Sequence, residues 1–261
     1  MSYSELSSKS NDKIKYVNKL VSSSPFRRQE GLFVIEGARL CADAYRSGYE
    51  ISECFITRTA MSKYADALSD LLADAGEVYL ITDGIAQKLS DTVNSQGVFC
   101  VVKMKERMTA EVKADLKYIA LENVQNPQNL GTVARTAEAL GINGLILSDG
   151  CDIYNPKALR ASMGSRLRIP VIKTDDLCTV LKSAAEKGML TLATVPDSSA
   201  EDITALDFSG GVITVIGNEG NGVTEQIKNS VKHKATIRMK GEAESLNAAS
   251  AAVIAMWEMM R

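Results

Sequence analysis

The alternation of short apolar runs with helix-like segments after residue 117 is the feature that most constrains the fold of this chain. The runs KYIALE, GLILS, MLTLATV and GVITVIG are separated by longer segments that have helical spacing or are rich in polar residues. Strands that alternate with helices pair in parallel, and helices cover both faces of the resulting sheet. The pattern predicts an α/β fold whose ligands bind at the carboxyl ends of the strands.

The first hundred residues show a second α/β pattern. GLFVIEG, ISECFIT, EVYLIT and GVFCVVK are strand-like, and helices are expected between or before them at residues 12–22, 38–48 and 63–75. The stretch that follows is charged and has few large apolar side chains, which is typical of a linker with some helix. The expected organisation is a small α/β domain at 1–102, a linker at 103–116 and a larger α/β domain at 117–261.

Composition excludes several classes of protein. The chain is 45% hydrophobic and 24% charged, which is ordinary for a globular protein. No apolar run reaches the length of a membrane span, and the N-terminal residues lack the apolar core of a signal peptide. Five scattered cysteines without a CxxC pair, and a single histidine, His233, are typical of a reduced protein without a zinc site. We therefore expect a cytoplasmic protein that holds no metal.

The basic residues are unevenly distributed, although the net charge is −2. Residues 1–28 hold six lysines or arginines, and residues 155–173 and 228–240 hold five each and no acidic residue. For nucleic-acid binding the distribution of charge matters more than its sum. The three segments either form a phosphate-binding face or are ordinary solvated surfaces, and charge alone does not distinguish the two.

Two loops after predicted strands contain unusual residues. In NVQNPQNLGTVAR, Asn129 precedes an expected helix start, where an asparagine caps free N–H groups, and Arg135 follows inside the helix. In VIGNEGNGV, three glycines allow a ligand to approach the backbone closely. The G-x-x-G-x-G spacing is not the dinucleotide fingerprint, and the carboxylate of Glu219 would repel a pyrophosphate. We therefore expect a neutral or cationic ligand at this second loop.

A third string, IRMKGEAESLNAASAAVIAMWEMM, ends the chain. Ser245 is expected to cap an alanine-rich helix at 245–260, whose small side chains allow other segments to approach closely. Taken singly, each of the three strings also fits an ordinary capped helix or a glycine-rich turn.

Together and in this order, the three strings resemble the signature motifs of the SpoU (TrmH-like) family of RNA 2′-O-ribose methyltransferases in the SPOUT superfamily. NxGxxxR, GxEGxG, and IxM followed by SLN match over roughly residues 118–260, and NPKALRASMGSRLRIPV resembles the family's R-x-S-x-G stretch. KYVNKLVSSSPFRRQEGLFVIEGARL resembles, more loosely, the ribosomal-protein-like RNA-binding domain that often precedes this catalytic domain. The resemblance implies a Rossmann-like parallel sheet with a C-terminal trefoil knot, which is an exception to the rule that connections do not thread, and a homodimer.

The resemblance also implies a cofactor, a substrate and residue roles. The cofactor is S-adenosylmethionine, held by the following residues of the knot loops: Thr194, Ile216, Gly217, Asn218, Ile237, Met239 and Leu246. The substrate is an RNA ribose 2′-hydroxyl, and the expected catalytic set is Arg135, Asn129, Glu219, Ser245 and Asn247. RNA contacts are expected from Arg160, Ser162, Lys15, Lys19, Arg27 and Arg28.

Arg135 resembles the family's catalytic arginine. Arginine stays protonated in proteins, so it is an awkward base. Arg135 either takes the ribose proton itself or binds an RNA phosphate that accepts it, and both versions remain open. One residue departs from the family pattern: Arg238 stands where the third motif commonly has proline. The loop thereby loses a fixed φ angle and gains a charge, which is expected to weaken cofactor binding slightly at most.

Three alternatives remain at this point. The chain could be a non-catalytic RNA-binding protein with the same fold, against which the retention of the catalytic set counts. It could be a nucleotide-dependent oxidoreductase, which the missing dinucleotide fingerprint disfavours. As a methyltransferase it could act on tRNA rather than on 23S ribosomal RNA, although the long N-terminal domain favours ribosomal RNA.

Overall fold

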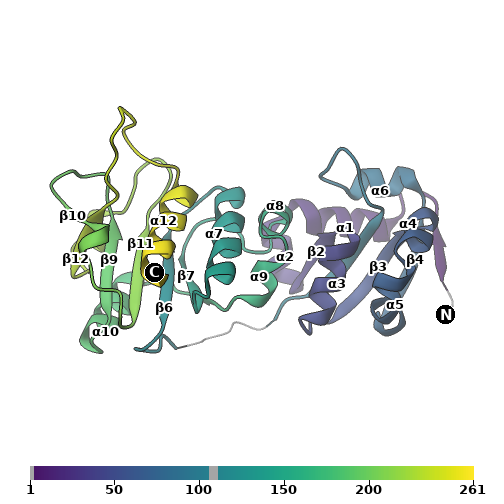
Figure 1. The fold of residues 1–261 in the computed structure, drawn as a ribbon. Helices are drawn as coiled ribbons and strands as arrows, with labels where there is room; N and C mark the ends of the chain where they lie inside the picture. Colours follow the sequence, from purple (N-terminus) through teal and green to yellow (C-terminus); the bar gives the residue numbers. More distant parts are fainter. Residues whose placement is uncertain (1–2, 106–110) are drawn as a thin grey trace. The chain divides into compact units, whose positions relative to one another are not determined.

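A computed structural model describes residues 3–105 and 111–261, which fall into two units (Figure 1). Unit 1 comprises Met1–Glu106 and Asp152–Leu167, and unit 2 comprises Arg107–Cys151 and Arg168–Arg261. The sequence places residues 152–167 inside the second α/β pattern, and the predicted domain boundaries do not anticipate that they pack within unit 1. No helix of the described residues is long and apolar enough to span a membrane.

Unit 1 is built on a mixed five-stranded sheet. Its strands lie in the order β1 (Ser4–Leu6), β4 (Glu77–Ile81), β3 (Ile51–Thr57), β5 (Val98–Lys103) and β2 (Leu32–Glu36). β4 pairs in parallel with β1 and β3, and β5 is antiparallel to β3 and β2. The four strands expected from the sequence are confirmed, whereas β1 is too short to show a period of two.

Helices cover both faces of this sheet. They are α1 (Asp12–Ser22), α2 (Ser24–Glu30), α3 (Ala38–Arg46), α4 (Arg58–Lys63), α5 (Ala65–Asp74), α6 (Asp83–Leu89) and α8 (Pro156–Ala161), with α9 (Ser165–Arg168) at the boundary to unit 2. The apolar stripe of α1, at Ile14, Val17 and Leu20, is fully buried in a core shared with β5 and α6. The helix expected at 63–75 is two helices, because Thr57 caps an earlier start for α4 and Tyr64 ends it.

A buried ion pair ties the segment at 152–167 to the start of the chain. The Arg27 side chain is 2% exposed, and its Nη2 lies 2.7 Å from Oδ2 of Asp152, to which Nε also donates. Nη1 of Arg27 donates to the carbonyl oxygens of Leu20 and Val21 at 2.7 and 2.9 Å. All three nitrogens of the guanidinium therefore have protein acceptors, which is what a buried charge requires.

Two residues expected to contact RNA are thus internal. Arg27 is held in the ion pair just described, and Ser162 is fully buried with its hydroxyl donating to the carbonyl oxygen of Leu159 at 2.8 Å. The expectation was wrong for both residues, because charge and polarity in a sequence do not reveal a buried partner that lies far away along the chain. The Tyr154 ring, 4.5 Å from that of Phe33 between centroids, fixes the same segment by apolar contact.

Replacing Arg27 by alanine is expected to destabilise the protein by about 3–5 kcal/mol, because the Asp152 carboxylate is left buried without a counter-charge. Urea unfolding of the full chain, followed by circular dichroism, measures the change. The matched control is Arg28→Ala, since Arg28 is the exposed neighbour on the same helix, and its loss should change stability by less than about 0.5 kcal/mol. Equal stability of the two variants would contradict the role given to the ion pair.

Unit 2 contains the parallel sheet that the sequence predicts. Its order is β10 (Glu201–Asp202), β12 (His233–Thr236), β9 (Leu190–Thr194), β11 (Val212–Ile216), β6 (Lys117–Glu122), β7 (Gly144–Ser148) and β8 (Val171–Lys173). All six pairings are parallel. The chain runs outward from β6 to β8 and then returns to strands on the other side of β6, so the direction of winding reverses there. Such a switch point is where open α/β sheets bind ligands.

Helices lie on both faces of this sheet as well. α10 (Leu177–Glu186) and α11 (Glu225–Lys228) pack on one face. The short helix η1 (Ile203–Ala205) contacts α12. On the other face α7 (Pro127–Leu140) and α12 (Ala248–Met260) lie side by side (Figure 1), and Met259 of α12 contacts Thr214 of β11. The described part of the expected linker, residues 103–105 and 111–116, contains no helix, and Lys103 is the last residue of β5. The remainder of the linker lies outside the described residues. The trefoil knot implied by the family resemblance stays a prediction.

The N-terminal caps of α7 and α12 differ from the residues expected from the sequence. The side chain of Asn126, not Asn129, caps α7, and Asn247, not Ser245, caps α12. Proline at the first position of α7 explains the earlier start. Proline has no backbone N–H, and at this position an N–H would have no acceptor within the helix. Asn129 and Ser245 are thereby free for contacts other than capping.

Candidate functional site

A cavity of about 290 Å³ lies at the carboxyl ends of β9, β11 and β12, which are neighbours in the sheet of unit 2. Three loops form its walls: residues 194–196 after β9, 216–223 after β11, and 237–246 between β12 and α12. The parallel pairing forces these strand ends to one edge of the sheet, so segments far apart in sequence meet there.

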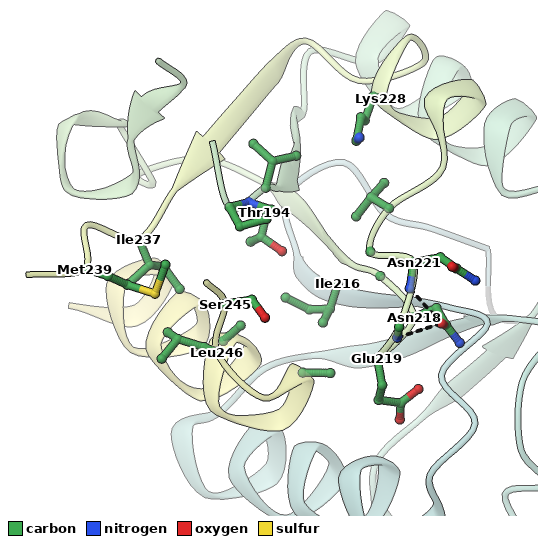
Figure 2. Close-up of a pocket in the computed structure, with 18 residues that line it drawn as sticks. Thr194, Ile216, Asn218, Glu219, Asn221, Lys228, Ile237, Met239, Ser245 and Leu246 are labelled. Carbon is green, nitrogen blue, oxygen red and sulfur yellow. Dashed lines mark hydrogen bonds between the residues drawn. The ribbon is translucent and has the colours of Figure 1, made fainter. Parts of the chain in front are cut away.

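All seven residues expected to hold the cofactor line this cavity: Thr194, Ile216, Gly217, Asn218, Ile237, Met239 and Leu246. Ser245 and Glu219 of the expected catalytic set also line it. Figure 2 shows Ser245 between Leu246 and Ile216, with Ile237 and Met239 at the same side of the cavity. The structure therefore brings together residues that the sequence distributes over more than fifty positions.

The glycine loop after β11 is closed by its own backbone. Asn218 and Gly222 exchange two backbone hydrogen bonds, and Oδ1 of Asn218 accepts from the N–H groups of Gly220 and Asn221 at 2.9 and 3.1 Å (Figure 2). A Cβ atom at Gly217 would lie 2.1 Å from the carbonyl carbon of Gly222. Only glycine allows this close approach, which shapes one wall of the cavity.

Glu219 joins the glycine loop to the start of α7. Its carboxylate accepts hydrogen bonds from the backbone N–H groups of Gln125 and Asn126, at 3.1 and 3.0 Å, and from the Asn129 amide at 2.9 Å. Oδ1 of Asn129 in turn accepts from the Asn247 amide at 3.2 Å, and Asn247 caps α12. A chain of three side chains therefore connects the loops of all three sequence motifs.

The electrostatics of Glu219 follow from these bonds. Partial burial raises the pKa of the carboxyl group, but the hydrogen bonds from Gln125, Asn126 and Asn129 outweigh burial and lower the pKa below its ordinary value of 4.5. Glu219 is therefore ionised at neutral pH. Because the folded pKa is lowered, the contribution of this carboxylate to stability is present at neutral pH and is lost as the pH falls through that lowered pKa.

Arg135 lies on the exposed side of α7 and does not line the cavity. Among the described residues its guanidinium has no hydrogen bond or ion pair, in contrast to buried Arg27. Its neighbours Val133, Ala134 and Ala137 are buried and fix the helix. An unpaired guanidinium held on a rigid helix is available to an anionic partner such as a phosphate.

The other expected RNA-binding residues belong to unit 1. Lys15, Lys19 and Arg28 are exposed on α1 and α2, with Lys15 paired to Asp12 at 2.8 Å and Lys19 over the Phe26 ring. Arg160 is held by Asp91 at 2.7 Å. Of the predicted RNA contacts outside the catalytic domain, Lys15, Lys19 and Arg28 are thus the most accessible.

Sequence reasoning missed part of the cavity wall. Val195, Pro196, Asn221 and Lys228 line it, and Figure 2 shows Lys228 and Glu219 on opposite sides. Lys228 belongs to the basic segment 228–240, but the amino acid sequence alone does not indicate that its helix, α11, turns this side chain toward the strand ends. Its nearest acidic partner is Glu225, one turn earlier, at 2.8 Å.

The lining suits S-adenosylmethionine. Apolar side chains of Ile216, Ile237 and Leu246 can enclose the adenine ring, and exposed backbone of the glycine loop can hydrogen-bond its edges. No phosphate-binding fingerprint is present, and the carboxylate of Glu219 is compatible with a cationic sulfonium group. The residues present therefore fit the cofactor that the motifs suggest.

Replacing Gly217 by alanine is expected to reduce S-adenosylmethionine binding by more than about tenfold, because the new methyl group must displace the backbone at Gly222. Calorimetry measures the affinity. The matched control is Gly220→Ala in the same loop, where the nearest atom to an added Cβ is Oδ1 of Asn218 at the ordinary contact distance of 3.5 Å. Equal affinity for the two variants would show that the backbone approach at Gly217 does not shape the binding site.

Comparison with known proteins identifies the family. The model of the SpoU rRNA Methylase family matches residues 117–257, and that of the MRM3-like substrate binding domain matches residues 11–100. An uncharacterized tRNA/rRNA methyltransferase of Synechocystis is 30% identical over 236 residues, which are 90% of this chain and 86% of that protein. The 23S rRNA (guanosine(2553)-2′-O)-methyltransferase RlmP of Bacillus subtilis is 28% identical over 256 residues, 98% of each chain.

Solved structures show the same fold. An AdoMet-bound rRNA methyltransferase from Sinorhizobium meliloti is 27% identical and superposes with a TM-score of 0.85 over 98% of this chain and 97% of that one. The SpoU methyltransferase AviRb from Streptomyces viridochromogenes, in complex with AdoMet, has a TM-score of 0.84 at 23% identity, with 96% of this chain and 97% of that chain covered. With both its larger and its smaller domain matched, the chain belongs to the SpoU rRNA methylase family.

Proposed function

We propose that this protein transfers a methyl group from S-adenosylmethionine to a ribose 2′-hydroxyl of ribosomal RNA. The observation that carries the proposal is that residues of the second and third family motifs line one cavity at the carboxyl ends of adjacent parallel strands. Hydrogen bonds from Asn129 to Glu219 and from Asn247 to Asn129 link the first motif to these two. The relative from Bacillus subtilis, which matches this chain along nearly its full length, is named as acting on 23S rRNA. A tRNA substrate is the second candidate, because the relative from Synechocystis is named for both RNA classes.

The chain's own residues would orient the reactants. When bound, S-adenosylmethionine supplies an electrophilic methyl group, and the loops after β9, β11 and β12 hold it. The ribose hydroxyl must be aligned with this methyl group and must lose its proton during the transfer. Ser245, which faces the cavity (Figure 2), is placed to hydrogen-bond the ribose or the cofactor.

Arg135 is proposed to bind the RNA phosphate next to the target ribose and to orient it to accept the hydroxyl proton. A protonated guanidinium is a poor base but a strong bidentate ligand for phosphate. The absence of an acidic partner among the described residues leaves its donors available. Glu219, Asn129 and Asn247 would act as positioning residues, because their hydrogen-bonded chain fixes α7, which carries Arg135, against the glycine loop.

The N-terminal domain, predicted at residues 1–102, is proposed to select the RNA. The match of residues 11–100 to a substrate-binding domain supports this role, as do the exposed basic residues Lys15, Lys19 and Arg28.

The protein is also proposed to form a homodimer through the catalytic domain. The support is the exposed apolar surface on α12, where Trp257 is 58% and Met260 is 38% exposed although the helix is apolar on all sides.

Replacing Arg135 by alanine is expected to lower methyl transfer by at least about 100-fold while S-adenosylmethionine affinity and thermal stability stay near those of the parent. The readout is a map of 2′-O-methylation across ribosomal RNA and tRNA from a deletion strain that carries the parent or the variant. Thr132→Ala, which changes another exposed residue of α7, is the control. Full methylation by the Arg135 variant would remove this residue from the mechanism. If the deletion strain lacked a 2′-O-methyl group in tRNA and none in ribosomal RNA, the substrate would be tRNA.

Replacing Lys15, Lys19 and Arg28 together by alanine is expected to weaken RNA binding and to flatten its dependence on salt. Each lost phosphate contact lowers the slope of log affinity against log salt by roughly 0.7 to 0.9, so the slope should fall by up to about 2 to 3. Filter binding across a salt series measures it. The control variant replaces three exposed basic residues elsewhere in the same unit by alanine: Arg46, Lys63 and Lys103. A parental slope in the first variant would show that these residues only solvate α1 and α2.

A further inference from the structure

The segment from Ile237 to Leu246 borders the cavity at both of its ends. Ile237 and Met239 line the cavity on the first leg of the segment, and Ser245 and Leu246 line it on the second. The residues between the legs, 240–244, are exposed. The position of this segment therefore decides how much of the cavity is enclosed, and its two legs need to be held for a ligand to find a preformed site.

The second leg is held by the hydrogen-bonded chain described above. Oδ1 of Asn247 accepts from the N–H groups of Ala249 and Ser250 at 2.9 and 3.3 Å, and its amide donates to Asn129 at 3.2 Å. Since Asn129 is buried and bonded to Glu219, this leg is attached to the rigid part of the unit. These hydrogen bonds involve no residue of the first leg, 237–239.

Arg238 holds the first leg. It lies between two cavity-lining residues but does not line the cavity itself. Its Nη1 donates to the carbonyl oxygen of Ser198 at 2.7 Å, and its Nε donates to Oδ2 of Asp202 at 3.3 Å. Asp202 is fixed in turn, because its Oδ1 accepts from the backbone N–H and the hydroxyl of Thr204 at 3.0 and 2.7 Å.

We propose that Arg238 is a positioning residue for the cofactor, which latches the first leg of the 237–246 segment onto residues 198–202. The inference rests on the proposed function and deepens it. A proline at this position would stiffen the leg through its fixed φ angle, whereas arginine stiffens it through two side-chain contacts to a neighbouring loop. The contacts keep Ile237 and Met239 against the cavity, so the cofactor does not have to order the leg when it binds.

The latch makes cofactor binding sensitive to salt. The side chains of Arg238 and Asp202 are 53% and 32% exposed, and such a pair is screened by ions and contributes a modest free energy. The two donors of Arg238 that contact Ser198 and Asp202 are already engaged. Direct binding of an RNA phosphate through the remaining N–H donors of Arg238 is a different role, which a loss of RNA affinity without a loss of cofactor affinity would reveal.

The first experiment is a double-mutant cycle on S-adenosylmethionine affinity, measured by calorimetry without RNA. Arg238→Ala and Asp202→Asn are each expected to weaken binding about two- to fivefold at low salt, and the double variant no more than Arg238→Ala alone. Asparagine keeps the oxygen that Thr204 requires. The matched control is Lys187→Ala, which removes an exposed 3.2 Å ion pair with Glu111 in the same unit, away from the cavity.

The salt dependence of cofactor affinity distinguishes the proposed contacts of Arg238 from a general effect of removing a charge. The affinity of the parent protein should fall toward that of Arg238→Ala as salt rises, while that variant and Asp202→Asn should respond little. Parental affinity of Arg238→Ala at low salt, or an equal loss in the Lys187 control, would overturn the proposal. A variant that binds cofactor normally and loses only RNA affinity would overturn it in favour of phosphate contact.

The second experiment does not depend on the cofactor. Hydrogen exchange of the ligand-free protein should show faster exchange at residues 238–246 in Arg238→Ala than in the parent or in the Lys187 control, with α12 unchanged because Asn247 still caps it. Unchanged exchange in this segment would overturn the latch. If the parent protein failed to bind S-adenosylmethionine at all, the proposed function would fail, while hydrogen exchange would still report on the latch.

Discussion

The hydrogen-bonded chain from Glu219 through Asn129 to Asn247 is the constraint on which the functional region depends. One carboxylate fixes the glycine loop to the start of α7, and one amide fixes α7 to the start of α12. Partly buried polar groups of this kind are costly to leave unpaired, at about 1–3 kcal/mol each. The arrangement therefore has one geometry in which every hydrogen bond is formed, and a departure from it costs free energy at each of these side chains. Residues that belong to separate sequence motifs behave here as parts of one structural element.

Unit 1 relies on a different interaction, the buried pair of Arg27 and Asp152. It attaches a segment from the middle of the catalytic half of the sequence to the N-terminal helices. A guanidinium with all its donors satisfied specifies where that segment must lie, and the Tyr154 ring contributes apolar contact beside it. Basic residues near the start of the chain thus divide into one that organises the fold and others, such as Arg28, that remain accessible to a polyanion.

The parallel sheet and its class could be predicted, because apolar runs are local properties of the sequence. Part of the cavity lining could be predicted from the resemblance of the motifs to a known family, since the loops after parallel strands share an edge of the sheet. The cap positions at Asn126 and Asn247 were missed, since several polar residues at each helix start can serve as caps and only the tertiary contacts of Asn129 select among them. The burial of Arg27 and Ser162 was missed for a related reason: their surroundings are set by packing that brings distant parts of the chain together, which no local pattern records. The position of Lys228 in the cavity wall was not predicted, because the direction of a one-turn helix depends on what it packs against.

The closure of the cavity by contacts between remote segments has a consequence for how the protein acquires its activity. Glu219 and Asn129 are 90 residues apart, and Asn129 and Asn247 are 118 apart. Contacts of such long range form late, since the entropy of closing the intervening chain must first be offset by the rest of the sheet and its helices. Nascent or partly folded chains would therefore have secondary structure and an apolar core before they have any affinity for a cofactor. We therefore expect the competence to bind cofactor to arise late in folding, so that a chain that stops earlier is inactive rather than partly active.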